Sequence, residues 1–229
     1  MDPEFWHERW QNAQIGFHQP KPNAKLAAYW PRLAPAPGST VFVPLCGKSL
    51  DMVWLADHGH HVIGIELSER AVDEFFAEQG LTPETRKHGE LTLKSSGPYE
   101  LWCGDFFEMT AGLVDGVAGL YDRAALVALP PPMRQRYTTH LLSLFPEAAP
   151  PPGLLITLEY DQARIDGPPH SVPQDEVERH FSPSYRIEEC HRASDNAPPP
   201  KFIDAGLTDV TEVAYLLHPL TEGASGGHA

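Results

Sequence analysis

The segment Val41-Phe-Val-Pro-Leu-Cys-Gly-Lys-Ser49, with Val62-Ile-Gly-Ile-Glu66 after it, decides the fold of this chain. An apolar run ends in a turn that contains glycine, a helical stretch follows, and a second apolar run ends in an acid. This order is typical of a doubly wound α/β fold that binds a nucleoside. The turn lets the backbone approach the ligand, and the acid accepts hydrogen bonds from the ribose hydroxyls. Gly47 precedes Glu66 by 19 residues, close to the roughly 20 expected for this arrangement.

Strand and helix patterns alternate along most of the chain, which predicts a mainly parallel sheet with helices on both faces. The last two strands have no evident helix between them, only 193–200, which predicts an antiparallel hairpin at one edge of the sheet. The predicted strands are 40–44, 61–66, 91–94, 99–103, 117–121, 154–160, 185–191 and 210–217. The predicted helices are 2–13, 23–30, 49–58, 68–79, 131–145 and 172–181.

The composition fits one soluble domain. Apolar residues make up 41% of the chain, enough to bury a core without disulfides or metal. The three cysteines are scattered and form no C-x-x-C pair, which fits a reducing compartment. No signal-peptide pattern is visible, and no apolar run approaches the roughly 18 residues that cross a bilayer. We therefore expect a cytoplasmic monomer with a single domain over 1–220, a helical cover of the active site over 1–36, and a disordered tail over 221–229.

The charge balance is acidic. The chain has 17 Lys and Arg residues against 31 Asp and Glu residues, a net charge of −14 with His neutral. A field of this sign repels phosphate backbones, and no basic stripe stands out, so a nucleic-acid partner is disfavoured. The stretch His58-Gly-His-His61 suggests metal ligands, but a surface turn between helix and strand explains it better, and we expect no metal site.

Three ligands compete for the turn at Gly47. Gly47-Lys-Ser49 resembles the end of a phosphate-binding P-loop, but that motif requires a second glycine where Phe42 stands. A dinucleotide-binding turn requires G-x-G-x-x-G, and this turn has one glycine. A ligand with a ribose but no phosphate, such as S-adenosylmethionine, needs only a close turn, an acid and apolar walls. The spacing alone is weak evidence, because many α/β domains have a glycine and a later acid by chance.

Five segments of the chain stand out: Phe17-His-Gln19, Pro44-Leu-Cys-Gly-Lys48, Gly64-Ile-Glu-Leu-Ser68, Tyr121-Asp-Arg-Ala-Ala-Leu126 and Gly167-Pro-Pro-His-Ser-Val-Pro173. Together they closely resemble the thiopurine S-methyltransferase family, especially its bacterial members. The resemblance runs in register from the N-terminal helix to about Leu217 and includes Pro-Leu-Cys-Gly-Lys in place of a glycine-rich loop. It implies the fold of S-adenosylmethionine-dependent methyltransferases, with a seven-stranded, mostly parallel sheet, helices on both faces and an antiparallel last strand.

The resemblance also implies roles for individual residues. Glu66 is expected to accept hydrogen bonds from both ribose hydroxyls, and Arg123 to lie near the cofactor and the acceptor sulfur. Phe17 is expected to pack on the aromatic substrate. The residues implied to contact S-adenosylmethionine are Trp10 above the cofactor, Leu45 at its methionine or ribose part, Glu66, Asp105 and Phe106 beside the adenine, and Arg123.

Each of these residues also has an ordinary structural interpretation. The alternatives are a helix anchor for Trp10, a capping or surface acid for Glu66, core packing for Phe17 and Phe106, an ion pair with Asp122 or Glu159 for Arg123, and an exposed charge for Lys48.

Methyl transfer to sulfur needs few side chains that take part in the chemical step, because the cofactor carries the reactive group. The enzyme must hold the nucleophile about 3 Å from the methyl group, in line with the departing sulfur, and exclude water. The nucleophile is expected to be a thiolate. A guanidinium at Arg123 favours that anion, so we expect no dedicated general base. The resemblance implies small aromatic or heterocyclic thiols as acceptors, and selenium or tellurium species as further ones.

One position departs from the family pattern. Animal members carry an arginine shortly before the final strand, and in our register that position falls among the prolines at 198–200. Lys201 and Arg192 are the candidates to replace it, or the substrate pocket differs.

The alternative to an enzyme is a non-catalytic module that binds a nucleoside or sequesters metal through the twelve histidines. The intact Phe17-His-Gln19 and Arg123 argue against a nucleoside-binding module that has lost its acceptor site. The absence of H-x-x-H and C-x-x-C spacing argues against metal sequestration.

Overall fold

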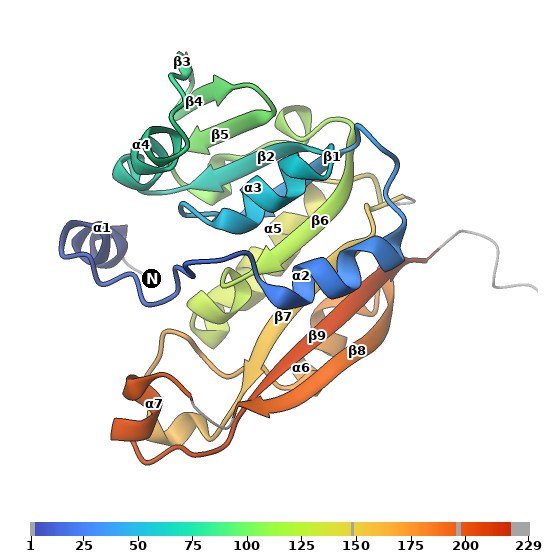
Figure 1. The fold of residues 1–229 in the computed structure, drawn as a ribbon. Helices are drawn as coiled ribbons and strands as arrows, with labels where there is room; N and C mark the ends of the chain where they lie inside the picture. Colours follow the sequence, from blue (N-terminus) through green and yellow to red (C-terminus); the bar gives the residue numbers. More distant parts are fainter. Residues whose placement is uncertain (1–2, 148, 196–197, 221–229) are drawn as a thin grey trace, which may run out of the picture.

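A nine-stranded sheet forms the centre of the computed structural model, which describes residues 3–147, 149–195 and 198–220. The strands are β1 (Thr40–Pro44), β2 (His61–Glu66), β3 (Glu84–His88), β4 (Leu91–Ser96), β5 (Tyr99–Cys103), β6 (Val117–Arg123), β7 (Gly153–Glu159), β8 (Tyr185–Asp195) and β9 (Val210–Pro219). Their order across the sheet is β3-β4-β5-β2-β1-β6-β7-β9-β8 (Figure 1). The five central strands from β5 to β7 are parallel, whereas β9 runs antiparallel to both β7 and β8.

The expected count of seven strands is wrong, because β3 and β4 add an antiparallel hairpin outside β5. Strand β3 was not predicted. Its sequence, Glu-Thr-Arg-Lys-His, is polar throughout and all five residues are exposed, so it lacks the apolar alternation that reveals a strand. The antiparallel last strand and the hairpin of β8 with β9 are confirmed.

Helices cover both faces of the sheet, as predicted (Figure 1). They are α1 (Pro3–Gln11), α2 (Ala24–Tyr29), α3 (Leu50–Asp57), α4 (Glu69–Glu78), α5 (Pro131–Ser143), α6 (Gln174–Phe181) and α7 (Pro200–Asp204). Alternate residues of β1 point to opposite faces of the sheet and pack in two separate hydrophobic cores. Val41 and Val43 pack in the core under α2, α3 and α4, whereas Phe42 packs in the core under α5 and α6. None of the helices in the described ranges has both the length and the apolar composition to cross a bilayer.

Helices α3 and α4 each begin directly after a turn that follows a central strand. Ser49 caps α3 by accepting a hydrogen bond from the Asp51 amide at 3.2 Å, and Ser68 caps α4 through the Ala71 amide at 3.4 Å. Each of the two helices thus begins with a serine cap. Both helix N-termini, with their unpaired amides, lie at the carboxyl ends of β1 and β2.

Helix α7 lies between β8 and β9 and was not predicted. It is five residues long and begins with proline, so it carries no helical periodicity that a sequence could reveal. Its Phe202 packs with Ile165, Leu207 and Val210 in a small separate core. Figure 1 places α7 and α1 at the same end of the sheet, where the parallel strands finish.

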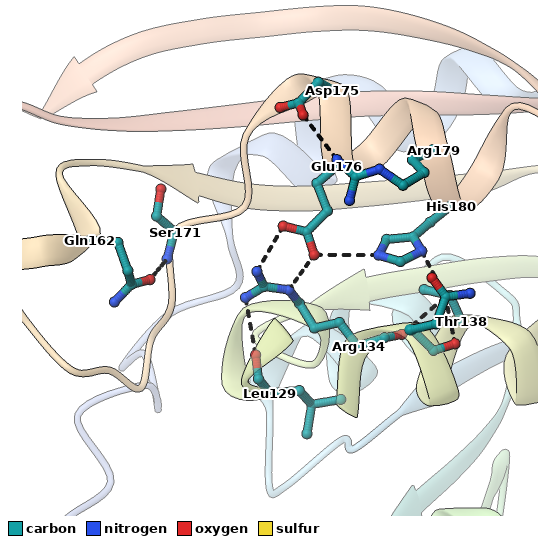
Figure 2. A network of polar contacts seen from close by, with 10 residues as sticks. Leu129, Arg134, Thr138, Gln162, Ser171, Asp175, Glu176, Arg179 and His180 are labelled. Atoms are coloured by element: carbon teal, nitrogen blue, oxygen red, sulfur yellow. Dashed lines mark hydrogen bonds and ion pairs between the residues drawn. The ribbon is translucent and has the colours of Figure 1, made fainter. Parts of the chain in front are cut away.

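A buried ion pair joins α5 to α6 (Figure 2). Arg134 is 2% exposed, and its Nε and Nη2 each donate to the Glu176 carboxylate at 2.7 Å. Its Nη1 donates to the Leu129 carbonyl at 3.1 Å, which fixes the loop before α5. His180 lies 3.3 Å from Glu176 and 3.2 Å from Thr138. Burial raises the pKa of Glu176, but the hydrogen bonds and charges of Arg134 and His180 outweigh burial and lower that pKa overall.

We predict that Glu176→Gln strongly destabilises the fold, because it leaves the Arg134 charge buried without a counter-charge. The expected loss in the free energy of unfolding is about 3–5 kcal/mol, measured by urea unfolding. Asp175→Asn is the matched control, since Asp175 pairs with Arg179 in the open, with side chains 73% and 60% exposed. That loss is expected to stay below about 1 kcal/mol. Equal losses in the two variants would contradict the assignment.

Candidate active site

A cleft of about 1010 Å³ opens at the carboxyl ends of the parallel strands. The turns after β1, β2, β5 and β6 form its floor, and α1, the segment 12–23 and α7 contribute to its outer walls. Ligands of doubly wound sheets bind at this edge. All seven predicted site residues line the cleft: Trp10, Phe17, Leu45, Glu66, Asp105, Phe106 and Arg123.

Glu66 joins the turns that follow β1 and β2. Its carboxylate accepts a hydrogen bond from the Gly47 amide at 2.9 Å and one from the Ser68 amide at 2.8 Å. The residue is 6% exposed, so the surface-acid alternative is wrong. Burial raises the pKa of Glu66 to about 7, although the backbone amides oppose this shift. An ionised carboxylate has about four lone-pair sites, so capacity remains for the hydroxyls of a ligand.

The turn after β1 adopts a left-handed backbone at two positions. Leu45 has φ of 46° and Gly47 has φ of 53°. A left-handed conformation costs energy at a residue such as Leu45 and persists where the surroundings enforce it, which occurs most often at functional sites. At Gly47 the space beside the backbone is tight as well. A Cβ there would lie 3.2 Å from the Trp10 ring, closer than normal van der Waals contact.

Trp10 and Phe17 hold the N-terminal segment against the turn at Gly47. Trp10 is 3% exposed, and its ring meets that of Phe17 edge to face with centroids 5.5 Å apart. Trp6 makes a similar edge contact with Phe17 at 5.8 Å. Trp10 therefore does anchor its helix, and at the same time its ring forms part of the cleft wall. Phe17 is half-buried rather than a core residue.

Asp105 and Phe106 lie after β5 with different degrees of exposure. Asp105 is exposed and caps the short 3-10 turn Phe106–Glu108 by accepting from the Phe107 amide at 3.0 Å. Phe106 is 4% exposed and packs on Tyr137 with ring centroids 5.0 Å apart. The core-packing alternative thus holds for most of the Phe106 ring, while the residue also lines the cleft.

Arg123 ends β6 inside the cleft and is held by three acceptors. Its Nε donates to Asp51 at 2.6 Å, its Nη2 to the Ser49 hydroxyl at 2.9 Å, and its Nη1 to the Phe17 carbonyl at 3.1 Å. The acid that pairs with Arg123 is therefore Asp51, and not Asp122 or Glu159 as the sequence suggested. Asp122 instead accepts from the Tyr137 hydroxyl at 2.6 Å, and Glu159 pairs with Arg192.

Asp51 is a site residue that sequence analysis missed. It is 1% exposed and accepts from the Asn23 amide, the Tyr121 hydroxyl and Arg123. An acid in the first turn of a helix is ordinary. No local pattern points to partners 28, 70 and 72 residues away in the chain.

Lys48 is not the exposed charge suggested by the sequence. It is 9% exposed, and its ammonium donates to Glu74 at 2.8 Å and to Glu78 at 2.6 Å. A P-loop lysine must reach the phosphates of the nucleotide. Two carboxylates of α4 already hold this ammonium, which disfavours the P-loop interpretation of the turn.

The histidine stretch at 58–61 has structural contacts. His60 accepts from the Trp30 indole at 3.2 Å and lies 3.0 Å from the Ser39 hydroxyl, while His58 stacks on Trp54. Across the described residues, no three His, Cys, Asp or Glu side chains are grouped so that they could hold a metal ion.

Another part of the cleft wall is built from two loops joined by a backbone hydrogen bond. Pro168 and Pro169 line the cleft, and the His170 amide donates to the Val127 carbonyl at 2.6 Å. The Tyr160 hydroxyl donates to the Pro169 carbonyl at 2.5 Å. Further along the loop, the Ser171 amide donates to the Gln162 side chain at 2.7 Å (Figure 2).

Of the two cations considered for the missing arginine, only one lies at the cleft. Lys201 lines it and donates to the Pro168 carbonyl. Arg192 is not among the cleft residues and pairs with Glu159 and Glu189 on the surface. Lys201 is therefore the better candidate.

The groups in the cleft fit S-adenosylmethionine. Glu66 offers carboxylate oxygens for two hydroxyls, and Gly47 permits a close approach of the backbone. Apolar and aromatic side chains supply the walls that an adenine ring requires. The residues that would hold the group are those around the two turns, namely Trp10, Leu45, Glu66, Asp105 and Phe106.

Comparison with known proteins agrees with this geometry. The family model described as thiopurine S-methyltransferase matches residues 1–219. A thiopurine S-methyltransferase of Pseudomonas entomophila is 51% identical over 217 residues, covering 95% of this chain and 99% of the relative. One from Methylococcus capsulatus is 50% identical over 218 residues, covering 95% and 97%.

Solved structures share the fold at much lower identity. A methyltransferase from Thiobacillus denitrificans, in complex with S-adenosyl-L-homocysteine, has a TM-score of 0.62 at 14% identity, covering 93% of this chain and 98% of that one. One from Anabaena variabilis has a TM-score of 0.63 at 13% identity, covering 95% of each chain. The predicted methyltransferase fold is thereby confirmed.

We predict that Gly47→Ala destabilises the fold more than Gly97→Ala. Both glycines have left-handed backbones, with φ of 53° and 57°, so both substitutions carry a backbone cost of about 1–2 kcal/mol. Only the Cβ at position 47 would press on Trp10, since nothing lies within 4 Å at position 97. Urea unfolding is expected to show an additional loss of about 1–3 kcal/mol for Gly47→Ala. Equal losses would mean that the Trp10 ring moves aside at no cost and that the added Cβ meets no steric resistance.

Proposed function

This chain belongs to the thiopurine S-methyltransferase family, and from that premise we propose that it methylates the sulfur of small aromatic or heterocyclic thiols. Methyl transfer with S-adenosylmethionine as the donor follows from family membership. The thiol as acceptor is our proposal, and the observation that carries it is the guanidinium of Arg123 in the cleft, next to Phe17.

When bound, S-adenosylmethionine supplies the activated methyl group. The chain has to bind the nucleoside, orient the acceptor and exclude water. Glu66 accepts the ribose hydroxyls, while Trp10 and Leu45 enclose the ligand at the first turn. Asp105 and Phe106 flank the adenine. These roles are supported by the position of each side chain at the carboxyl ends of the strands.

Arg123 stabilises the acceptor as a thiolate, the reactive form of a thiol. Its three hydrogen bonds use three of the five N–H donors of a guanidinium. The two remaining N–H groups are available to the sulfur. No general base is needed for a thiol whose pKa is lowered in this way.

The acceptor lies in the part of the cleft lined by Phe17, Pro168 and Pro169. These apolar surfaces suit a flat ring. Lys201, at the edge of the same wall, replaces the arginine of the animal enzymes. The size of the cleft is also compatible with selenium or tellurium species as acceptors.

A non-catalytic module finds no support in the relatives, which are named as enzymes. A single domain over 1–220, a monomeric state and a cytoplasmic location stay predictions. The expected tail at 221–229 lies outside the described residues.

The experiment that tests the proposal offers the enzyme thiophenol or phenol as matched acceptors with S-adenosylmethionine. Mass spectrometry is expected to find the S-methyl product and S-adenosylhomocysteine with thiophenol, and at most a trace of product with phenol. No S-methylation, or equal methylation of both acceptors, would contradict a thiol-specific enzyme.

We predict that binding of S-adenosylhomocysteine weakens as the pH falls through about 7. The pKa of Glu66 is raised to about 7 by burial, and only the ionised carboxylate accepts from both ribose hydroxyls. Deprotonation therefore favours binding, and the affinity at pH 6 should be roughly tenfold lower than at pH 8.

Glu66→Gln provides the control for this pH dependence. Isothermal titration is expected to show weaker binding at pH 8, because the amide offers one acceptor atom in place of two. It should also show little further loss at pH 6. A wild-type affinity that is constant between pH 6 and pH 8 would contradict the role of Glu66.

We predict that Arg123→Ala lowers turnover more than it weakens cofactor binding. The variant loses the charge next to the acceptor sulfur but keeps Glu66 and the first turn. Turnover with saturating thiophenol should fall by roughly tenfold or more, equivalent to about 1.4 kcal/mol or more in the barrier, while the dissociation constant for S-adenosylhomocysteine changes less. Unchanged turnover would rule out Arg123 as the thiolate-stabilising group.

A further inference from the structure

Asp51 has more long-range partners than its position in a helix requires. Its Oδ1 accepts from the Asn23 amide at 2.7 Å, and its Oδ2 accepts from the Tyr121 hydroxyl at 3.0 Å and from Arg123 Nε at 2.6 Å. These donors come from the residue that caps α2, from the middle of β6 and from the end of β6. One buried carboxylate thus joins three separate parts of the fold.

The same carboxylate determines how Arg123 lies. A guanidinium is planar, and Asp51 holds its Nε edge while Ser49 holds Nη2. With two points of the plane fixed, the remaining N–H groups on Nη1 and Nη2 have defined directions. The side chain of Arg123 is 10% exposed and that of Asp51 1% exposed, so water competes little for these bonds.

The segment that carries Phe17 is tied to this pair at two points. The Phe17 carbonyl accepts from Arg123 Nη1 at 3.1 Å, and the Asn23 amide donates to Asp51. The Asn23 side chain in turn caps α2 through the Lys25 amide at 2.8 Å. The residue expected to touch the acceptor ring and the cation expected to touch its sulfur are therefore both located relative to one carboxylate.

We propose that Asp51 is a positioning residue of the methyl-transfer site, which directs the free N–H groups of Arg123 toward the acceptor sulfur and holds the Phe17 segment over the same point. This inference rests on the proposed function, because it assumes that Arg123 stabilises a thiolate. Asp51 is 1% exposed, so in this proposal it acts on the acceptor through Arg123.

A positioning role and a simple neutralising role predict opposite effects of removing the charge of Asp51. If Asp51 positions Arg123, Asp51→Asn frees the guanidinium to turn away, and the bound thiol loses its stabilised anion. Its pKa then rises toward that of the free thiol. If Asp51 only reduced the field of Arg123, Asp51→Asn would increase that field and lower the pKa of the bound thiol further.

The other titratable and charged groups near the pair are His18, Tyr121 and Lys48. The pKa of His18 is lowered by burial and by Lys48 and Arg123, although Glu78 and Asp51 oppose this shift. The pKa of Tyr121 is raised by burial and by Asp51. Lys48 is paired with Glu74 and Glu78. His18 is therefore one group whose titration could be mistaken for that of the thiol, and Glu66, whose pKa burial raises to about 7, is the other.

The test measures kcat against pH, with S-adenosylmethionine and the thiol both saturating, because kcat reports the pKa values of groups in the bound complex. It compares the wild type with Asp51→Asn, each with two aromatic thiols of different pKa. A limb that belongs to the thiol moves with the acceptor, whereas a limb from His18 or Glu66 does not. The acid limb is the pH range in which the rate falls as the solution is acidified. In the wild type its midpoint should lie about 1–3 pH units below the pKa of the same thiol free in solution. In Asp51→Asn it should rise by about one pH unit or more toward that value, and kcat should fall roughly tenfold.

Two further variants keep the test decisive if Asp51→Asn folds poorly. Ser49→Gly removes only the hydroxyl that holds Nη2, and glycine at a helix cap costs a few tenths of a kcal/mol. It should shift the limb in the same direction by a smaller amount. Asp57→Asn changes an exposed acid at the end of the same helix and should leave the profile unchanged.

The outcomes separate the two proposals. A wild-type limb at the pKa of the free thiol, or no methylation of either thiol, would overturn the role of Arg123 and with it the proposed function. A lowered wild-type limb that stays in place or moves further down in Asp51→Asn and Ser49→Gly would overturn the positioning role of Asp51 alone. A fall in melting temperature without a shifted limb would likewise leave Asp51 with a purely structural role.

Discussion

The carboxylate of Glu66, placed between the amides of Gly47 and Ser68, is the interaction on which the site depends. Parallel pairing of β1 with β2 brings the two turns side by side, with Pro44 opposite Ile65 in the register. The carboxylate then links the turn before α3 to the turn before α4. Its burial is costly, as the raised pKa shows. A group kept buried at such a cost, with acceptor capacity left over, is suited to a ligand that brings its own hydroxyl donors.

A second buried carboxylate organises the other half of the cleft. Asp51 and Arg123 neutralise each other at the end of β6, and their hydrogen bonds reach the segment that carries Phe17. The two carboxylates have different surroundings. Glu66 has only neutral donors among the partners that hold it, whereas Asp51 has a guanidinium. Under the proposed function, the first carboxylate offers acceptors to the ribose hydroxyls, and the second directs the N–H donors of Arg123 toward the acceptor.

Much of this arrangement could be predicted from local sequence. The bounds of β1 and β2 and the cap at Ser68 follow from short patterns, because strand burial and helix capping involve neighbours in the chain. The pairing of a glycine turn with Glu66 was predictable because the fold fixes their spacing. The predicted site residues gathered in one cleft for the same reason, since each follows a parallel strand or belongs to the N-terminal segment.

The features that escaped prediction depend on contacts between distant parts of the chain. Asp51 resembles any acid in the first turn of a helix, and its partners become visible only when β6 and the N-terminal segment are in place. Lys48 resembles a surface charge until α4 brings two acids to it. Strand β3 is polar and α7 is a single short turn, so neither carries a periodic signal.

The most direct measurement of the central claim is thermal unfolding of the protein with S-adenosylhomocysteine, ATP or NAD, each in separate samples. A ligand present at about 100 times its dissociation constant adds roughly 2.7 kcal/mol to the stability of the fold. For a chain of this size that corresponds to a rise in Tm of about 5–11 °C. We expect this rise with S-adenosylhomocysteine alone, because the turn lacks the amides and the free lysine that phosphates require. A rise with ATP or NAD alone, or with none of the three, would contradict a pocket organised by Glu66 for a nucleoside without phosphate.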